Sequence, residues 1–141
     1  MADNTISLKS LLVPSKEVES EYPGMPGFKV KLTFLSRETL VSIRKKSTKT
    51  VFKNRQPVEE LDDELFLKLY VAATVKGWSG FKYAYLEKLA PVDVSGKDSE
   101  TLLEYSEDNA LAIMKSSTDF DGFVSEVVSD LGNFSKSSSK I

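Results

Sequence analysis

Residues 27–46 read GFKVKLTFLSRETLVSIRKK, and this stretch decides the fold expected for the chain. Apolar and polar side chains alternate over residues 28–34, which is the period of a strand with one buried face. Ser36 follows as a candidate N-cap, and Glu38 stands in the first turn, where the helix dipole favours an acid. Basic residues 44–46 close the segment at the negative end of a helix. The pattern predicts a strand followed directly by a helix.

Further elements are expected downstream of this unit. Residues 61–77 form a very apolar helix, which Gly77 ends. Ser106 caps the next helix, and residues 118–131 carry apolar side chains at helical spacing. A short strand over residues 50–52 would pair with the first strand, because a lone strand leaves its backbone unsatisfied. We expect an α+β fold, a mainly helical single domain with a small N-terminal antiparallel β element and about four helices.

The 141 residues are expected to form one domain with loose ends. Residues 1–27 are interpreted as an N-terminal arm and a mobile Pro/Gly-rich loop, because residues 14–27 contain three prolines and two glycines. Residues 28–134 would form the globular domain. The low-complexity end SKSSSKI, residues 135–141, is expected to be disordered.

The composition excludes much of ordinary enzymology. Hydrophobic residues make up 40% of the chain, which is enough for a core, and the formal net charge is −2. The chain has no cysteine and no histidine, which excludes disulfides, thiolate and imidazole chemistry and the common metal sites. No apolar stretch has the length of a membrane helix. We therefore expect no catalytic group, metal, cofactor, nucleic-acid or membrane function.

Charge is distributed unevenly along the chain. Residues 1–60 contain 11 bases and 7 acids, whereas residues 61–141 contain 8 bases and 14 acids. Opposite charges on two parts of one small domain favour head-to-tail self-association.

A run of basic residues follows the first helix and has two interpretations. Several cations on one face can neutralise nucleic-acid phosphates. Bases at a helix C-terminus are also expected from the dipole alone, and the acidic remainder of the chain favours this solvated face. The run comprises Arg44, Lys45, Lys46, Lys49, Lys53 and Arg55.

The segment GWSGF, residues 77–81, is the most distinctive local feature. Gly77 and Gly80 bracket Trp78 and Phe81 and would let the backbone turn tightly around the indole. We interpret these four residues as a structural anchor in the core, with a recognition surface as the alternative.

Apolar clusters near the two chain ends are the candidate partner-binding residues. The N-terminal cluster is either a short element packed on the body or a loose arm that docks on a partner. The C-terminal stripe is either part of the core or a docking helix. The candidates are Leu8, Leu11, Leu12, Phe120, Phe123 and Val127.

Three segments, in this order and spacing, resemble the tail assembly chaperones of bacteriophages with long, non-contractile tails. They are residues 27–46, the helix ending in KGWSGF, and LLEYSEDNALAIM at residues 102–114. The turn VKGWSGF is similar to the Val-x-x-Trp-x-Gly-hydrophobic pattern of that family. Tyr105-Ser106 followed by Asp108-Asn109 matches its aromatic-Ser/Thr helix start with an acid-Asn pair.

The resemblance implies a non-enzymatic protein made in the cytoplasm of the infected bacterium. Such proteins coat the tape measure protein, keep it soluble, help recruit tail tube subunits, and are absent from the mature virion. It also implies self-association into homo-oligomers and a possible longer, frameshifted form. The alternatives are a structural tail or head-completion subunit of the virion, and a small nucleic-acid-binding regulator that uses the basic run.

Overall fold

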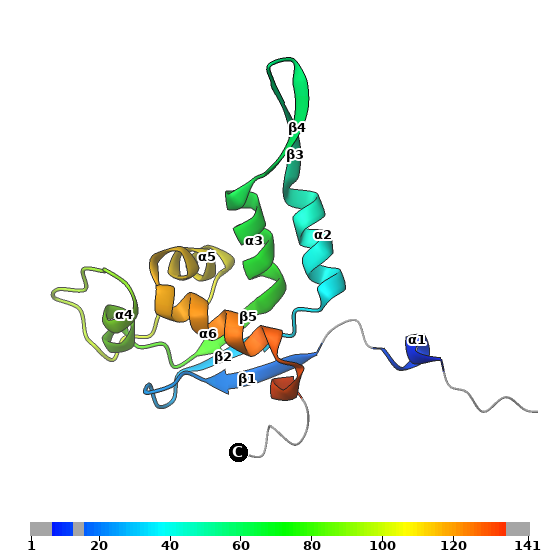
Figure 1. Ribbon diagram of the computed structural model, residues 1–141. Coiled ribbons are helices and arrows are strands. Elements are labelled where there is room, and N and C mark those ends of the chain that lie inside the picture. The colour runs from blue at the N-terminus through cyan, green and yellow to red at the C-terminus, as the bar shows by residue number, and fades with distance from the viewer. Residues whose placement is uncertain (1–6, 13–15, 135–141) are drawn as a thin grey trace, which may run out of the picture.

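The computed structural model describes residues 7–12 and 16–134, and Figure 1 shows how its elements are arranged. Within these residues the chain forms six α-helices, one 3-10 helix and five strands in two antiparallel sheets. The elements are α1 (Leu8–Leu11), β1 (Glu17–Glu21), β2 (Lys29–Thr33), α2 (Arg37–Ser47), β3 (Thr48–Lys53), β4 (Gln56–Leu61), α3 (Asp63–Thr74), β5 (Val75–Ser79), α4 (Tyr83–Leu89), α5 (Glu107–Ser116), α6 (Thr118–Ser129) and η1 (Leu131–Phe134).

The prediction of a mainly helical domain with one small N-terminal β element is wrong. The strand expected at residues 28–34 is confirmed as β2, but it is the centre of a three-stranded sheet in the order β1-β2-β5. Val30 and Leu32 of β2 are fully buried, while Lys29 and Lys31, which alternate with them, are exposed. The sheet therefore has one face in the core and one in water, as an alternating strand requires.

The loop predicted for residues 14–27 is wrong over residues 17–21, which form β1. β1 pairs antiparallel with β2, from Glu17 opposite Thr33 to Glu21 opposite Lys29. A proline- and glycine-rich turn then returns the chain to β2, and the composition of this turn conceals the strand before it. The predicted tail at residues 135–141 lies outside the described residues, as do residues 1–6 and 13–15 of the predicted arm.

The helix predicted over residues 61–77 ends at Thr74, and the chain continues as β5. Gly77 is therefore not the residue that ends the helix. Lys31 pairs with Gly77 and Leu32 with Val75, so Lys76 is an extra residue, a β-bulge in the ladder. Pairing with β2 overrides the local helical pattern, because it buries Val75 and satisfies the backbone of an otherwise open sheet edge.

The second sheet is the β3–β4 hairpin, which stands away from the body (Figure 1). The predicted strand at residues 50–52 exists, but its partner is β4 and not the first strand. Asn54 and Arg55 form the two-residue turn with φ angles of 51° and 66°. Positive φ at both central residues is the type I′ geometry that joins twisted strands.

Side chains cap four of the described helices, and the predicted caps Ser36 and Ser106 are confirmed. Ser36 accepts a hydrogen bond from Thr39 N, and Asp62 and Ser106 cap α3 and α5 in the same way. The last helix, α6, is capped by Ser117, whose hydroxyl accepts a hydrogen bond from Phe120 N. These four caps supply acceptors for N–H groups that the first helical turn leaves free.

Helices α3 and α6 pack on the inner face of the three-stranded sheet, and α5 packs against both of these helices (Figure 1). The core beneath them is rich in aromatic rings. Phe28 lies at its centre, 4.2 Å from Phe81 and 5.4 Å from Tyr22 between ring centroids. Phe120 joins the cluster through Tyr22 and Trp78. These contacts connect the sheet, the segment after β5 and the last helix.

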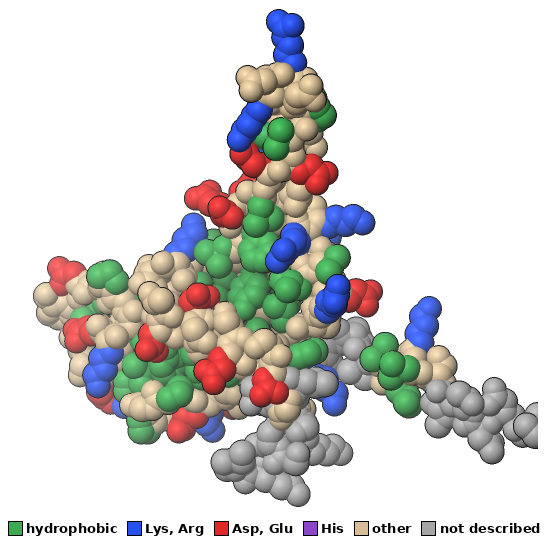
Figure 2. All heavy atoms as spheres, viewed as in Figure 1, with side chains coloured by type: hydrophobic (Ala, Val, Ile, Leu, Met, Phe, Trp, Pro, Cys, Tyr) green, Lys and Arg blue, Asp and Glu red, His purple; other side chains and the backbone are tan. Residues whose placement is uncertain are grey.

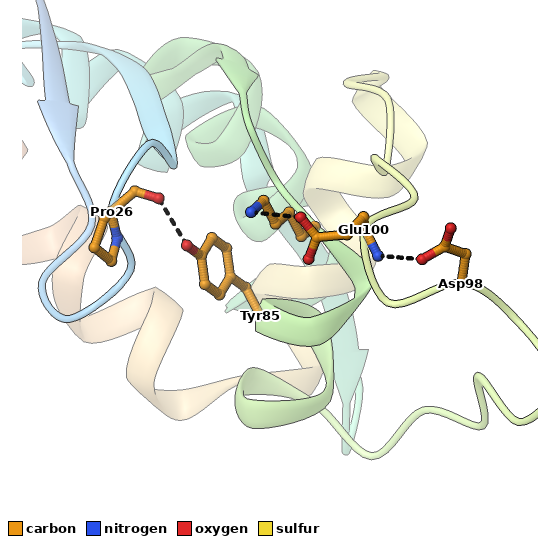
Figure 3. Close-up of polar contacts among 5 residues, drawn as sticks. Pro26, Tyr85, Asp98 and Glu100 are labelled. Atoms are coloured by element: carbon orange, nitrogen blue, oxygen red, sulfur yellow. Dashed lines mark hydrogen bonds and ion pairs between the residues drawn. The ribbon is translucent and has the colours of Figure 1, made fainter.

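Helix α4 and the loop that follows it are held by polar contacts shown in Figure 3. The Tyr85 hydroxyl donates to the carbonyl of Pro26 at 2.7 Å, across to the β1–β2 turn. Glu100 N donates to Asp98 at 2.9 Å, and the Glu100 carboxylate forms an ion pair with Lys82 at 2.8 Å. The long connection between α4 and α5 is thereby fixed against the body.

The surroundings of Tyr22 predict how the free energy of unfolding responds to alkaline pH. Its hydroxyl donates to Asp119, and burial, this bond and the carboxylate charge raise the pKa of Tyr22 well above 10. In the unfolded chain the phenol ionises near pH 10, so its stabilisation is complete below that pH and is lost as the pH rises further. We expect the free energy of unfolding to fall above about pH 10, and less steeply in Tyr22→Phe.

Urea unfolding between about pH 8 and 11, with phenolate absorbance recorded in parallel, measures this dependence. Tyr70 and Tyr105 also have pKa values raised by burial, so they contribute to the pH dependence of the wild-type chain. Tyr70→Phe is therefore measured beside Tyr22→Phe, to separate the contribution of Tyr22 from that of another buried tyrosine. A stability that is the same across this range in the wild-type chain would contradict the prediction.

Candidate functional site

An apolar groove lies between α2 and α3. Its volume is about 940 Å³, and α2 and α3 form its two walls. Figure 2 shows hydrophobic side chains gathered between these helices, below the hairpin. The apolar lining residues of the body are Phe34, Ile43, Leu69, Ala72 and Ala73.

The shape of the groove follows from the side chains on the two helices. α3 is apolar on nearly all sides, and its packing on α2 and α5 leaves part of this apolar surface exposed. Ala72 and Ala73 are small, and opposite them α2 presents Thr39 and Ser42. Short side chains on both walls keep the helices from filling the space between them. The resulting trough suits an apolar helix or extended segment, as in helix-in-groove recognition.

The rim of the groove is mainly basic. Lys9, Lys16 and Lys46 line it, against a single acid, Glu38. This excess of positive charge around an apolar floor favours an occupant whose apolar face is flanked by acidic residues.

The N-terminal cluster borders the groove but is not packed into the body. Leu11 and Leu12 line the groove from the side of α1. The exposed fractions of Leu8, Leu11 and Leu12 are 68%, 63% and 65%, and α1 buries no residue. Three neighbouring leucines exposed to this degree form an apolar surface available to a partner. Of the two sequence interpretations, this placement agrees with the arm and not with the packed element.

The C-terminal stripe lies mostly in the core. Phe120 is fully buried and stacks on Tyr22, so it cannot contact a partner in this structure. Phe123 and Val127 are partly buried against the same core. The stripe therefore holds α6 on the sheet, and the structure does not bring it together with the leucines of α1.

The GWSGF segment serves the core. Trp78 Nε1 donates to the carbonyl of Leu103 at 2.9 Å, and its ring meets Phe81 edge to face at 5.3 Å. Gly80 has a φ of +70°, and a Cβ there would lie 2.0 Å from the carbonyl oxygen of Gly27. Gly77 is different, because a Cβ there would only reach ordinary contact with Lys31 at 3.9 Å.

The basic run is divided between α2, β3 and the hairpin turn that contains Arg55. Arg44, Lys45 and Lys46 lie at the end of α2, whereas Lys49 and Lys53 lie on β3. The acids of β4 lie across the ladder from β3, and Lys53 forms an ion pair with Glu60 at 3.0 Å. Interleaved acids make this a mixed surface and not a continuous phosphate-binding stripe.

Sequence reasoning misses the groove, although a signal for it is present. The apolar character of residues 61–77 predicts burial on several sides and gives no indication of the uncovered side around Leu69. The alternation places Phe34 on the buried face of the strand, yet it lies beyond the end of β2 and is only half-buried. The usable signal is the excess of apolar positions on α3 over those that its neighbours cover.

Within residues 7–12 and 16–134, no group of three or more acidic side chains is placed to hold a metal ion. None of the helices in this part of the chain is both long and apolar enough to cross a membrane.

Comparison with known proteins finds no matching family model, no matching curated protein and no matching solved structure.

Proposed function

We propose that this protein is a tail assembly chaperone of a bacteriophage with a long, non-contractile tail. It binds the tape measure protein through the α2–α3 groove and the leucines of α1, keeps that client soluble, and helps recruit tail tube subunits. It acts without a catalytic group in the cytoplasm of the infected bacterium, and it leaves before the virion is complete.

The observation that carries the proposal is the groove with its exposed leucine arm. A long, apolar, helical client needs a chaperone that offers apolar surface and releases it again. Leu11 and Leu12 face the same 940 Å³ space as Ile43 and Leu69, so a client segment there would contact both sides. Many copies with modest affinity per site give avidity along such a client and remain releasable. The order of the three motifs in the sequence supports the choice of client.

A groove variant tests the proposal directly. Ala72→Glu places a carboxylate on an exposed position of the groove, where the client is expected to be apolar and acidic at its flanks. A charge buried against an apolar partner should weaken binding by about 2 kcal/mol, or about thirtyfold. We expect the tape measure protein to precipitate when it is co-expressed with this variant.

Ala112→Glu is the matched control, because Ala112 is an exposed helical alanine outside the groove lining. This variant should keep the client soluble as well as the wild type does. The double variant Ala72→Glu/Leu11→Asp is compared with the wild type. If the client is equally soluble with both chains, the groove assignment is contradicted. A client that is soluble without the chaperone, or stoichiometric chaperone in purified virions, would contradict the function.

A further inference from the structure

The loop between α4 and α5 combines exposed acidic side chains with exposed apolar ones. Residues 91–108, which form this loop and the first residues of α5, contain six acids and one base, and all six acids are exposed. Val92 and Leu102 are also exposed, by 40% and 54%. Connections longer than about 12–15 residues without a helix or strand are uncommon and are often functional. The composition of this loop is that of a contact surface.

The groove between α2 and α3 is apolar too, but the charge around it has the opposite sign. Three exposed lysines, Lys9, Lys16 and Lys46, line it against one acid, Glu38. We propose that, when no client is bound, the α4–α5 loop of one copy docks in this groove of a second copy. Val92 of the loop lies on the apolar floor, and the loop acids face the rim lysines. Opposite charges around an apolar contact steer association and fix its orientation.

The loop is held away from the groove of its own chain. Ala84 N donates to the carbonyl of Ser99 at 3.0 Å, and Tyr83 N donates to that of Thr101 at 2.9 Å, so α4 fixes the returning half of the loop. Figure 1 shows the loop beside α4, on the far side of α3 from α2. Among the described residues, those that line the groove include none from the loop. The contact therefore joins two copies of the chain.

Charge selects this loop among the exposed apolar segments. In the part of the chain that the structure describes, the other large apolar side chains that are exposed lie on α1, α2, α3 and the β3–β4 hairpin. α1, α2 and α3 border the groove themselves, so the hairpin and the loop are the remaining candidates. The tip of the hairpin carries Lys53 and Arg55, which the rim lysines would repel. The loop carries the acids that these lysines attract.

Docking of the loop in the groove joins two different surfaces of the chain, so it can continue from copy to copy. The rim lysines belong to residues 1–60 and the loop acids to residues 61–141, so the contact uses the uneven charge distribution of the sequence. One consequence rests on the proposed function, which places the client in the same groove: the client displaces the loop. Self-association then shields the apolar groove until a client arrives.

Charge reversal tests the docking in the chain alone, without client. Asp93→Lys with Asp98→Lys on the loop, and separately Lys16→Glu with Lys46→Glu at the groove, should each weaken self-association about tenfold in sedimentation velocity. A mixture of the two variants should associate like the wild type, because a basic loop then meets an acidic rim and an acidic loop meets a basic rim. Raising NaCl from about 50 to 500 mM should weaken the association of the wild type and of the mixture.

Glu19→Lys with Glu126→Lys is the matched control. It changes the net charge by the same amount as the loop reversal, at exposed positions on β1 and α6 that belong to neither surface, so association should persist. Circular dichroism of every variant checks that the fold is kept. A wild-type chain that stays monomeric, a mixture that fails to regain association, or a control weakened as much as the loop reversal would overturn the proposal.

Client solubility separates a failure of this inference from a failure of the proposed function. The loop reversal should keep the tape measure protein soluble on co-expression, because its groove is intact. Ala72→Glu places a carboxylate in the groove and should abolish both client binding and self-association. If Ala72→Glu loses the client but associates like the wild type, the docking is overturned and the proposed function stands. If the loop reversal abolishes association and the client is soluble without any chaperone, the docking stands and the proposed function is contradicted.

Discussion

Replacing Phe28 with alanine is expected to lower the free energy of unfolding by about 3–5 kcal/mol. Phe28 is fully buried, and its ring stacks on Phe81, Tyr22 and Tyr85 at centroid distances of 4.2, 5.4 and 6.3 Å. Truncation leaves a cavity among rings from three parts of the chain, which cannot all move inward. Because small domains are stable by only about 5–15 kcal/mol, the variant should be partly unfolded at moderate temperature.

Urea unfolding with fluorescence of Trp78 measures this loss, since the indole lies in the same aromatic cluster. Phe52→Ala is the matched control, because this phenylalanine is 75% exposed on the hairpin. Its effect on the free energy of unfolding should stay within about 0.5 kcal/mol. A Phe28→Ala variant that loses less than about 1 kcal/mol would contradict the placement of this ring at the centre of the core.

Replacing Gly80 with alanine is expected to cost about 3 kcal/mol. The backbone there has a φ of +70°, and a Cβ would lie 2.0 Å from the carbonyl oxygen of Gly27. That oxygen belongs to the backbone of the β1–β2 turn, which cannot yield as a flexible side chain would. Strain in the left-handed region and displacement of the turn therefore add together.

Two other glycines separate these contributions. Gly96 has a φ of +75°, and a Cβ there would meet no atom within 4 Å beyond its chain neighbours, so Gly96→Ala should cost only about 1 kcal/mol of backbone strain. Gly122 lies inside α6 with open space around it, and Gly122→Ala should raise stability by about 0.5–1 kcal/mol. Thermal unfolding of the three variants gives the order, and equal losses for Gly80 and Gly96 would argue against the close approach to Gly27.

The strand–helix unit is predictable because its signals are local. The alternation around Val30 and Leu32 requires only neighbouring residues, and Ser36 caps its helix from three residues away. The same holds for Asp62 and Ser106. A side-chain cap and an apolar period act over one or two helical turns, so they can be identified without knowledge of the fold.

The remaining strands depend on partners distant in the sequence. Val75 and Trp78 follow an apolar helix without a break in pattern, and only their positions opposite Leu32 and Val30 make that segment a strand. β1 has weak alternation between prolines and becomes a strand because β2 offers its edge. Tertiary pairing overrides local propensity in both cases.

The candidate site is predictable in part. The leucines of α1 can be identified from their grouping, because three leucines close together in the sequence indicate an apolar contact surface. The same reasoning selects Phe120, but it lies in the core, because helical spacing gives the apolar face of α6 and not what covers that face. The excess of apolar positions on α3 is a signal for an uncovered side of this helix. It does not select Leu69 and Ile43, because a groove between two helices depends on how closely they approach.

The sequence by itself determined the central strand and its helix, the helix caps, the exclusion of thiol and imidazole chemistry, and the opposite charges of the two parts of the chain. Only the tertiary structure decided the partners of β2 and the groove between α2 and α3. The physical reason is range: caps, periodicity and composition act between near neighbours, whereas burial and strand pairing depend on which distant surfaces meet.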